Sequence, residues 1–492
     1  MTHLSINEAF TPSTKRIASR IAILLVCAMT YANAIAQTTL LAGKADELPA
    51  PSVVNEAVED VPNPWDRVKI IKKKKAAAKK KKRKKATTLV MPEDFELKFI
   101  DSLSIVNADT ARLIFPAGHK RIMPLYAKLS RLFQGQNERI SFLHLGDSHI
   151  QADVVSGRMR QNLSSMAGSS YADRGLLFPF GAIGTNAPWD YKITSTGRWD
   201  KTRNIERSPS RPMGIAGAVA ATSDPSASLT INVKDERWAF DTLHILGETT
   251  AGAKTPLVVL DGQAYSPIAV PASVASASAD SIDAEISHTG FVFQLPRETT
   301  TCQVVFEGSG TFDLRGLVPT SPHPGIIYSA TGINGATCTS WNRCQKFAEE
   351  LPTICPDVLV AALGTNDANG RADSFNPEVF KANYRKLLDK ILEVNPDCFI
   401  IFVTNNDCYI GGSRTWCPTT PASAQAIREL AAEYHGCYFD VFEIMGGSHG
   451  TDRWVSAGLQ NTDHVHFTAK GYNLLGDLLF NALMIDYEET AQ

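Results

Sequence analysis

Strand-like and helix-like segments alternate in two separated parts of this chain, and this alternation strongly constrains the fold. An apolar run at residues 140–145 is typical of a buried strand, and a helix is expected at 153–166. After residue 326 the pattern returns, with strands expected at 358–363, 399–403 and 438–441 and helices at 377–394, 422–434 and 469–484. Alternation of this kind predicts a parallel sheet with helices on both faces.

Residues 213–316 have a different pattern, in which short runs of alternating apolar and polar residues recur. One example is the run at 229–233, and turn residues such as Asp261-Gly262 separate such runs. Short, evenly spaced strands with turns between them indicate a β-sandwich. We therefore expect a β-sandwich domain at 176–322, inserted into an α/β domain made of residues 92–175 and 323–492.

The N-terminal segment has the layout of a secretory signal peptide. Basic residues, among them Arg16 and Arg20, precede an apolar stretch at 21–29, and Ala34-Ile35-Ala36 follows as an A-x-A cleavage site. The alternative is an uncleaved N-terminal anchor, but the apolar stretch is short for a membrane span. We expect residues 1–36 to be removed, no transmembrane segment to remain, and the protein to be exported to the periplasm or the extracellular space.

Residues 37–91 are expected to be a disordered linker, because they are rich in Pro, Ala and charge and lack periodicity. Within it, residues 69–85 contain twelve basic residues and no acidic one. The simplest interpretation is a solvated, charged spacer. The alternative is contact with an anionic polymer of the cell envelope. Export argues against nucleic acid as a partner.

Eight cysteines follow Cys27, and an even number in an exported protein permits disulfides. Cys408 and Cys417 flank a short loop, and Cys338 and Cys344 are a second close pair, but the sequence leaves the connectivity open. The spacings do not form a zinc pattern, and the chain has no P-loop or Rossmann glycine fingerprint. We expect no metal and no cofactor.

Three short motifs carry the chemistry, and two of them directly follow expected strands. They are Gly146-Asp147-Ser148-His149, Gly364-Thr365-Asn366-Asp367 and Asp463-His464-Val465-His466. A serine hydroxyl becomes a nucleophile when a histidine, itself held by a carboxylate, takes its proton. We assign these roles to Ser148, His466 and Asp463.

Acyl transfer also needs hydrogen-bond donors for the oxyanion that develops on the carbonyl oxygen. The backbone N–H of Ser148 and the side chain of Asn366 are the first two candidates. A glycine N–H in the segment 332–336 is the third, with Gly332 and Gly335 both available. Each motif alone is a common turn sequence, so the assignment depends on their joint order.

These blocks resemble those of the SGNH, or GDSL-type, hydrolases. The resemblance covers roughly residues 95–175 and 320–485, and it implies a three-layer α/β/α flavodoxin-like fold and ester hydrolysis. It also implies Ser148 as nucleophile, His466 and Asp463 as base and partner, and Gly335 and Asn366 as oxyanion donors. His149 departs from the leucine of many members, which points away from the lipase branch.

The inserted β region makes the chain similar to exported O-acetylesterases that act on cell-wall glycan. We therefore expect an esterase that removes O-acetyl groups from a polysaccharide, with peptidoglycan preferred. The alternatives are other acetylated glycans or short-chain lipid esters as substrates, or a glycan-binding envelope protein with a vestigial hydrolase core. His144 is expected to pack in the core, Asp147 and Asp367 to stabilise turns, and Asp407 to line the cleft. The loop residues Arg174, Asn186, Trp189, Tyr191 and Trp199 are expected to contact sugar or to pack between domains.

Overall fold

The computed structural model describes residues 89–92, 95–100, 104–107, 110–166, 172–271, 285–287, 290–411 and 413–491. All of these belong to one compact unit, Pro62–Gln492. The expected signal peptide at 1–36, and the expected linker at 37–91 apart from its last three residues, lie outside the described residues. The Lys-rich run therefore lies outside them too. No helix in the described part is long and apolar enough to cross a membrane.

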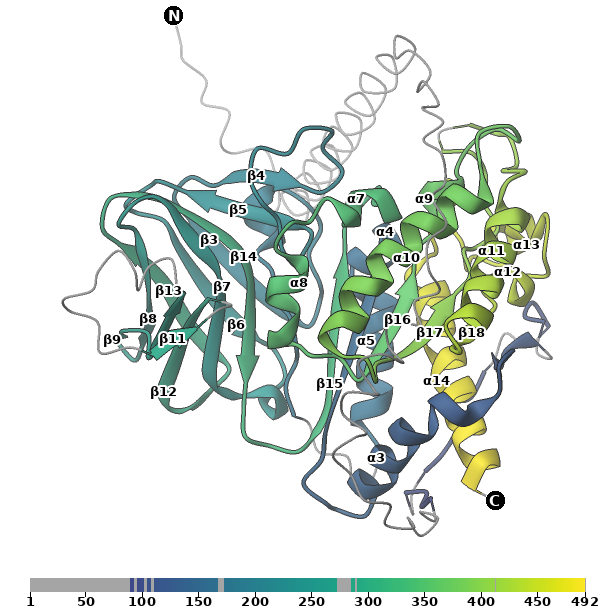
Figure 1. Cartoon of the computed structure of the whole chain (residues 1–492), viewed down its shortest axis with the longest axis horizontal. Helices are drawn as coiled ribbons and strands as arrows, with labels where there is room; N and C mark the ends of the chain where they lie inside the picture. Colours follow the sequence, from purple (N-terminus) through teal and green to yellow (C-terminus); the bar gives the residue numbers. More distant parts are fainter. Residues whose placement is uncertain are drawn as a thin grey trace, which may run out of the picture. The chain divides into compact units, whose positions relative to one another are not determined.

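A six-stranded sheet forms the centre of the α/β part (Figure 1). Its strands lie in the order β1 (Leu113–Ile114), β18 (Cys437–Phe439), β17 (Phe399–Val403), β16 (Val358–Ala362), β2 (Arg139–Gly146) and β15 (Gly325–Gly332). Only β1 runs antiparallel to its neighbour. Without β1, and numbered along the chain, the strands have the order 2-1-3-4-5, which is the flavodoxin-like order. The expected α/β fold is confirmed.

Helices cover both faces of this sheet because alternate side chains of each buried strand point to opposite sides. On one face Phe142 and Val360 pack in a core with α3 (Met123–Phe133), α5 (Val154–Ser164) and α14 (Ala469–Ala491). On the other face Leu143 and Leu359 pack with α7 (Cys338–Asn342), α8 (Phe347–Glu350), α10 (Pro377–Val394) and α11 (Thr420–Glu433). The remaining short helices are α4 (Ser148–Gln151), α9 (Thr365–Ala368), α12 (Val441–Ile444), α13 (Gly450–Ser456) and the 3-10 turns η3 (His119–Arg121), η4 (Phe180–Ile183), η5 (Glu236–Trp238) and η6 (Leu351–Thr353).

The β-rich region that separates β2 from β15 consists of two further sheets (Figure 1). The seven-stranded sheet has the order β11 (Glu285–Ser287), β10 (Ala269–Pro271), β12 (Phe291–Thr299), β7 (Phe240–Gly252), β14 (Gly310–Thr320), β5 (Ala218–Thr222) and β4 (Asp200–Arg203). The five-stranded sheet has the order β3 (Tyr191–Thr196), β6 (Ser228–Val233), β13 (Thr301–Glu307), β8 (Thr255–Leu260) and β9 (Gln263–Tyr265). Ile231 and Val304 from one sheet share a core with Phe291 and Phe312 from the other, so the region is a sandwich, as expected.

The β-rich region also packs directly on the α/β part. Val219 of β5 and Leu246 of β7 belong to the same buried cluster as Trp341 of α7 and Phe347 of α8. A shared apolar core of this kind opposes independent movement of the two parts, because separating them would expose these side chains to water.

Several expected elements differ in their bounds, and the contacts of two of them explain the difference. The strand expected at 438–441 ends at Phe439, because the Asp440 side chain accepts a hydrogen bond from the backbone N–H of Glu443 and caps α12. The helix expected at 469–484 continues to Ala491 as α14, and Tyr487 near its end is fully buried. By contrast, the expected helix at 377–394 and the expected strand at 399–403 have the observed bounds of α10 and β17.

Candidate active site

Ser148 lies at the carboxyl end of β2, where the sheet order reverses. β2 has β15 on one side and β16 on the other, and ligands bind at such switch points in open α/β sheets. Asp147 caps α4, since its Oδ1 accepts a hydrogen bond of 2.9 Å from the N–H of His149. Gly146 allows the tight turn, because a Cβ there would lie 2.4 Å from Ile150 Cγ1. This turn places Ser148 at the first position of the helix.

A hydrogen-bonded line joins Ser148 to the C-terminal motif. Ser148 Oγ lies 2.9 Å from Nε2 of His466, and Nδ1 of the same ring lies 2.7 Å from Oδ2 of Asp463. A carboxylate only accepts hydrogen bonds, so Nδ1 carries the proton and Nε2 is the acceptor for the serine hydroxyl. The three residues that the sequence grouped by order alone therefore meet in space.

The loop of Asp463 is folded around its own carboxylate. Its Oδ1 accepts hydrogen bonds from the N–H groups of Val465, at 2.9 Å, and His466, at 3.0 Å. His464 has a left-handed φ of 54° and its ring stacks on Tyr409, with ring centroids 4.1 Å apart. The turn thus directs His466 toward Ser148 and His464 away from it.

The pKa values of this pair move in opposite directions. Burial raises the pKa of Asp463, but the hydrogen bonds from the His466 ring and from two backbone N–H groups outweigh it and lower the pKa to about 2. The hydrogen bond to Asp463 raises the pKa of His466, against the opposing effect of burial. Asp463 is therefore ionised at neutral pH, and its charge increases the basicity of the histidine.

The residues expected to supply the oxyanion donors, Ser148, Gly335 and Asn366, line the same cleft. The N–H of Ser148, at the start of α4, has no carbonyl partner within the helix. Asn366 lies in α9, the short helix that follows β16. Its Nδ2 donates to Asp147 Oδ2 at 2.9 Å and to the Ala336 carbonyl at 3.1 Å. Gly335 has φ +82° and lines the cleft beside Ser148.

Gly332 has a different structural position from Gly335. It pairs with Gly146 at the end of β15, and a Cβ on it would lie 2.5 Å from the Asp147 carbonyl oxygen. Gly332 is thus required for close packing behind the nucleophile turn, and it is absent from the cleft lining. Of the two glycines left open by the sequence, Gly335 is the one that faces the cleft.

The cleft at Ser148 has a volume of about 580 Å³, which is in the usual range for a small-molecule site. Five of its lining residues are asparagines, and the lining contains no Lys or Arg. The lining residues are Ser148, Ala152, Asn186, Asn334, Gly335, Asn366, Asn369, Gly411, Asn461, Asp463, Val465, His466, Phe467 and Tyr472. Within the described ranges, no group of three or more His, Cys, Asp or Glu side chains could hold a metal ion.

Residues 315–474 match the GDSL-like Lipase/Acylhydrolase family. A solved structure described as a peptidoglycan O-acetylesterase has the same fold: the match covers 76% of this chain and 97% of that chain, with 18% identity and a TM-score of 0.60. Residues 315–474 therefore form a GDSL-like lipase/acylhydrolase domain, in a chain that shares the fold of the matched structure. No curated protein sequence matches this chain.

Two further solved structures match about a third of this chain. A putative GDSL-like lipase from Parabacteroides merdae has 21% identity over 33% of this chain and 74% of its own, with a TM-score of 0.27. An acetylxylan esterase from Geobacillus stearothermophilus has 21% identity over 32% of this chain and 73% of its own, with a TM-score of 0.26.

His149, the residue that departs from the expected motif, lies next to His466 and Tyr472 beside the candidate site. Its Nδ1 lies 2.9 Å from the Tyr472 hydroxyl, and its ring centroid lies 5.4 Å from that of His466. Burial lowers the pKa of His149 to about 3, so the ring is neutral at neutral pH. A neutral neighbour avoids a second positive charge beside His466 when that residue is protonated.

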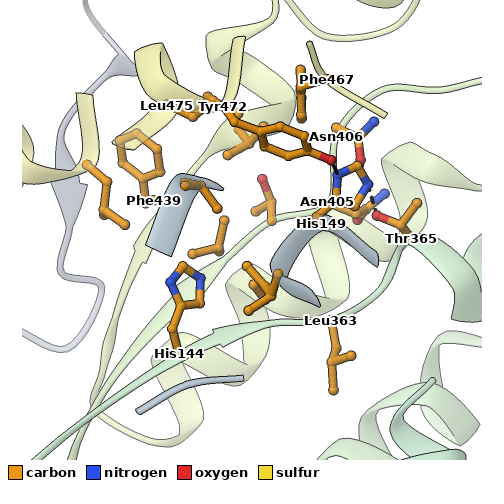
Figure 2. Close-up of a pocket in the computed structure, with 17 residues that line it drawn as sticks. His144, His149, Leu363, Thr365, Asn405, Asn406, Phe439, Phe467, Tyr472 and Leu475 are labelled. Carbon is orange, nitrogen blue, oxygen red and sulfur yellow. Dashed lines mark hydrogen bonds between the residues drawn. The ribbon is translucent and has the colours of Figure 1, made fainter. Parts of the chain in front are cut away.

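Figure 2 shows a second pocket, which has a smaller volume of about 60 Å³ and is lined in part by His149. His144, Leu363, Asn405 and Tyr472 are among its lining residues, but Ser148 is not. His144 is buried there and its Nδ1 lies 3.0 Å from the Tyr328 hydroxyl, as expected for a core histidine. This pocket belongs to the interior of the hydrolase rather than to the cleft.

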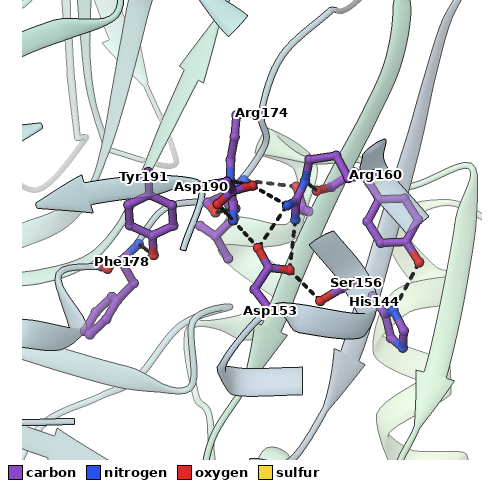
Figure 3. Close-up of polar contacts among 11 residues, drawn as sticks. His144, Asp153, Ser156, Arg160, Arg174, Phe178, Asp190 and Tyr191 are labelled. Atoms are coloured by element: carbon purple, nitrogen blue, oxygen red, sulfur yellow. Dashed lines mark hydrogen bonds and ion pairs between the residues drawn. The ribbon is translucent and has the colours of Figure 1, made fainter. Parts of the chain in front are cut away.

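Four buried charges connect α5 to the segment that leads into β3 (Figure 3). Arg160 Nη1 lies 2.9 Å from Asp153 Oδ2 and 2.5 Å from Asp190 Oδ2, while Arg174 Nη2 lies 2.8 Å from Asp190 Oδ1 and also contacts Asp153. All four side chains are at most 2% exposed. Asp153 has φ 55°, so the network holds a strained residue directly after the nucleophile helix.

Other expectations for individual residues had mixed outcomes. Asp407 does not line the cleft, which corrects our expectation: its carboxylate is buried, accepting from Trp416 Nε1 at 2.8 Å and from the Thr451 N–H at 3.1 Å. Asp367 stabilises a turn, as expected, by accepting from the N–H of Cys338 at 3.0 Å. Tyr191 packs inside, and its hydroxyl donates to the Phe178 carbonyl.

The cysteines of the described part are all thiols in this structure. Cys408 and Cys417 nonetheless face each other, since the Cys417 N–H donates to the Cys408 carbonyl at 3.0 Å and their thiols hydrogen-bond. Sequence reasoning missed Gln151, Asn334, Asn369 and Asn461 as residues of the site. Asn334 stands inside the glycine-containing segment already singled out, whereas Gln151 carries no local signal.

Proposed function

We propose that this chain is an exported serine esterase that removes O-acetyl groups from a polysaccharide, and that the polysaccharide is peptidoglycan. The observation that carries the proposal is the line of hydrogen bonds from Ser148 Oγ through His466 to Asp463, with distances of 2.9 and 2.7 Å. This arrangement supplies a nucleophile, a base and a carboxylate that orients the base.

In the first half-reaction Ser148 Oγ attacks the acetyl carbonyl carbon while His466 Nε2 takes the hydroxyl proton. The tetrahedral intermediate collapses when the sugar oxygen leaves with that proton. The products of this step are a free sugar hydroxyl and an acetyl group bound to Ser148. The charge of Asp463 stabilises the imidazolium that forms in between.

The intermediate carries its negative charge on the former carbonyl oxygen. The N–H groups of Ser148 and Gly335 and the amide of Asn366 stabilise this charge. The longer hydrogen bond of Asn366 Nδ2, at 3.1 Å, goes to the Ala336 carbonyl. We infer that the oxyanion replaces this contact, while the bond to Asp147 keeps the amide oriented.

In the second half-reaction His466 takes a proton from water, and the resulting hydroxide attacks the acetyl carbonyl. The bond to Ser148 Oγ breaks, the serine regains a proton from His466, and acetic acid leaves and gives up its proton to the solvent as acetate. No oxidation or reduction occurs, and the side chains end in their starting protonation states.

Three observations support a glycan as the substrate. The cleft is lined by neutral amides, which suit hydroxyl and acetamido groups. The fold matches that of a protein described as a peptidoglycan O-acetylesterase. The sequence of residues 1–36 has the layout of an export signal, and in this proposal residues 37–91 act as a charged spacer between the signal and the enzyme.

The test is acetate release from O-acetylated peptidoglycan, acetylated xylan and 4-nitrophenyl acetate by the purified chain and by Ser148→Ala. We expect kcat to fall by about 10⁴- to 10⁶-fold in the variant. Ser456→Ala is a matched control, because Ser456 is exposed and bonds only to the Asp452 carbonyl on its own helix. Equal rates for Ser148→Ala and the wild type would refute the nucleophile assignment, and a preference for xylan would refute the choice of polymer.

A further inference from the structure

Gln151, at the end of the nucleophile helix, links three segments that meet at the cleft. Its Nε2 donates to Asn186 Oδ1 at 2.7 Å and to Thr185 Oγ1 at 2.8 Å, and its Oε1 accepts from the Asn334 N–H at 2.7 Å. The Gln151 side chain is only 3% exposed. One buried amide therefore joins the Ser148 helix, the Gly335 loop and the segment that leads into β3.

The contacts of Asn186 fix the direction of its amide group. Its Oδ1 also accepts from Asn334 Nδ2 at 2.9 Å and from Thr185 Oγ1 at 3.3 Å. Since these donors converge on the oxygen, the NH₂ group is on the opposite side of the amide. Asn186 is exposed and lines the same cleft as Ser148 and Gly335, so this NH₂ group is available to a ligand there.

The charged side chains that line the cleft limit the chemical class of ligand that it can bind. Its one carboxylate, Asp463, is already paired with His466, and the lining has no Lys or Arg side chain that could pair with an anionic ligand. A ligand carboxylate or phosphate would have to be desolvated here without a charged partner, which is costly. An uncharged sugar with hydroxyl and acetamido groups can instead exchange its water contacts for hydrogen bonds with the asparagine amides.

We propose that Asn186 is a substrate-binding residue that donates its amide N–H to an oxygen of an uncharged sugar unit next to the acetyl ester. The inference rests on the proposed function, because it concerns the substrate of the same site. In this proposal the segment that leads into the β-rich region binds the substrate directly. The cleft is then selective for neutral over acidic glycans.

The β-rich region has a groove of its own, with a volume of about 470 Å³, on the five-stranded sheet. Thr230, Arg297 and Gln303 are among its lining residues, which include no aromatic ring. Arg297 is already paired with Asp261 at 2.7 Å. Sugar-binding sites commonly use aromatic faces and free polar groups, which this groove lacks. We therefore assign substrate binding to Asn186 and take the control substitution from the five-stranded sheet.

The experiment compares Asn186→Ala and Asn186→Asp with the wild type. Asn186→Asp retains an acceptor oxygen for Gln151 and Asn334, loses the NH₂ group and adds a negative charge, whereas Asn186→Ala loses the donor without adding charge. Asn232→Ala is the matched control, because Asn232 is exposed on the five-stranded sheet and donates only to Thr301 Oγ1. Substrates are O-acetylated chitotriose, O-acetylated oligogalacturonate and 4-nitrophenyl acetate.

Both Asn186 variants are expected to raise KM for acetylated chitotriose by about 5- to 10-fold, which is the effect of losing one hydrogen bond. We expect kcat for this substrate to change less than KM in Asn186→Asp, whereas a merely structural role would lower kcat and the melting temperature together. The wild type should hydrolyse the neutral oligosaccharide with a higher kcat/KM than the acidic one. Asn232→Ala should match the wild type.

The outcomes separate the two proposals. A wild type that hydrolyses none of the three esters refutes the proposed function itself. An active wild type with an unchanged KM in Asn186→Asp refutes the role of Asn186 and leaves the esterase assignment intact. Equal kcat/KM for neutral and acidic oligosaccharides refutes the selectivity for uncharged sugars.

Discussion

The carboxylate of Asp463 lies 2.7 Å from Nδ1 of His466, only three residues away along the chain. Because this contact raises the pKa of His466 above its ordinary value of 6.5, the protonated ring persists to higher pH than in a free histidine. Protonated His466 cannot accept the Ser148 proton, so we expect kcat/KM to fall as the pH drops through a midpoint above 6.5.

Asp463→Asn tests the origin of this midpoint. Removing the carboxylate should lower the pKa of His466, move the acid limb of the profile to lower pH, and reduce kcat by up to about 10⁴-fold. Asp452→Asn is the control, since Asp452 contacts His464 and Tyr409 rather than His466. An acid limb at the same pH in wild type and Asp463→Asn would contradict the role of the contact.

Gly332 and Gly335 should respond differently to alanine. A Cβ at Gly332 would lie 2.5 Å from the Asp147 carbonyl oxygen and 2.6 Å from the Gln151 nitrogen, and neither backbone atom can move easily. At Gly335 the nearest atom, Ile205 Cγ2, is 3.9 Å away, so only the φ of +82° opposes a side chain. We expect Gly332→Ala to cost about 1–3 kcal/mol or more and Gly335→Ala about 1 kcal/mol.

Thermal unfolding followed by circular dichroism checks this contrast. Gly332→Ala should have the lower melting temperature and should also lose activity, because the displaced atoms belong to the turn that carries Ser148. A Gly335→Ala variant less stable than Gly332→Ala would show that the close approach of β15 to this turn is not limiting.

The facing thiols of Cys408 and Cys417 should oxidise to a disulfide in the presence of glutathione disulfide. The two thiols lose their hydrogens, and glutathione disulfide is reduced to two glutathione molecules. The hydrogen bond from Cys408 lowers the pKa of Cys417, which favours the thiolate that attacks a disulfide. Closing so short a loop should stabilise the fold by about 2–3 kcal/mol.

Alkylation under denaturing conditions, followed by peptide mass spectrometry, reads out this bond. After oxidation Cys408 and Cys417 should take up label only when a reductant is added. Cys338 and Cys344, which are buried thiols in and beside α7, should be labelled in both cases. Full labelling of Cys417 without reductant would contradict the prediction.

Arg174→Met should destabilise the protein strongly, because it leaves Asp153 and Asp190 buried with one cation fewer. Removing one partner of a buried ion pair costs about 3–5 kcal/mol. Arg198→Met is the control: Arg198 is 92% exposed and lies 3.8 Å from Asp224, so we expect a change within about 0.5 kcal/mol. Urea unfolding midpoints measure both, and equal midpoints would mean that the buried network contributes no net stability.

Much of the fold could be predicted from the sequence because its signals are local. The apolar spacing of α10 and the continuous apolar run of β17 gave the observed bounds. The end of β18 could not be predicted, since Val441 continues the apolar run and only the capping contact of Asp440 ends the strand. Asp407 was misassigned because its partners, Trp416 and Thr451, are defined by the tertiary fold.

The site shows the same division. Ser148, Asn366 and His466 stand in recognisable motifs after strands, so their grouping was predicted, whereas Gln151 depends on partners 35 and 183 residues away. A side chain whose role depends on contacts with residues far away in the sequence cannot be recognised from a local motif. Asn186 was singled out only as a loop residue for this reason.

The four buried charges around Asp153 also bear on how this enzyme can be engineered. A minimal hydrolase made by cutting out residues 176–322 would lose Asp190, and Arg160 and Arg174 would then share a single buried carboxylate. The β-rich region therefore cannot be exchanged for another domain without affecting the α/β part. Any graft that replaces it has to supply an acidic side chain at the position of Asp190, or else the segment after the nucleophile helix will lose its support.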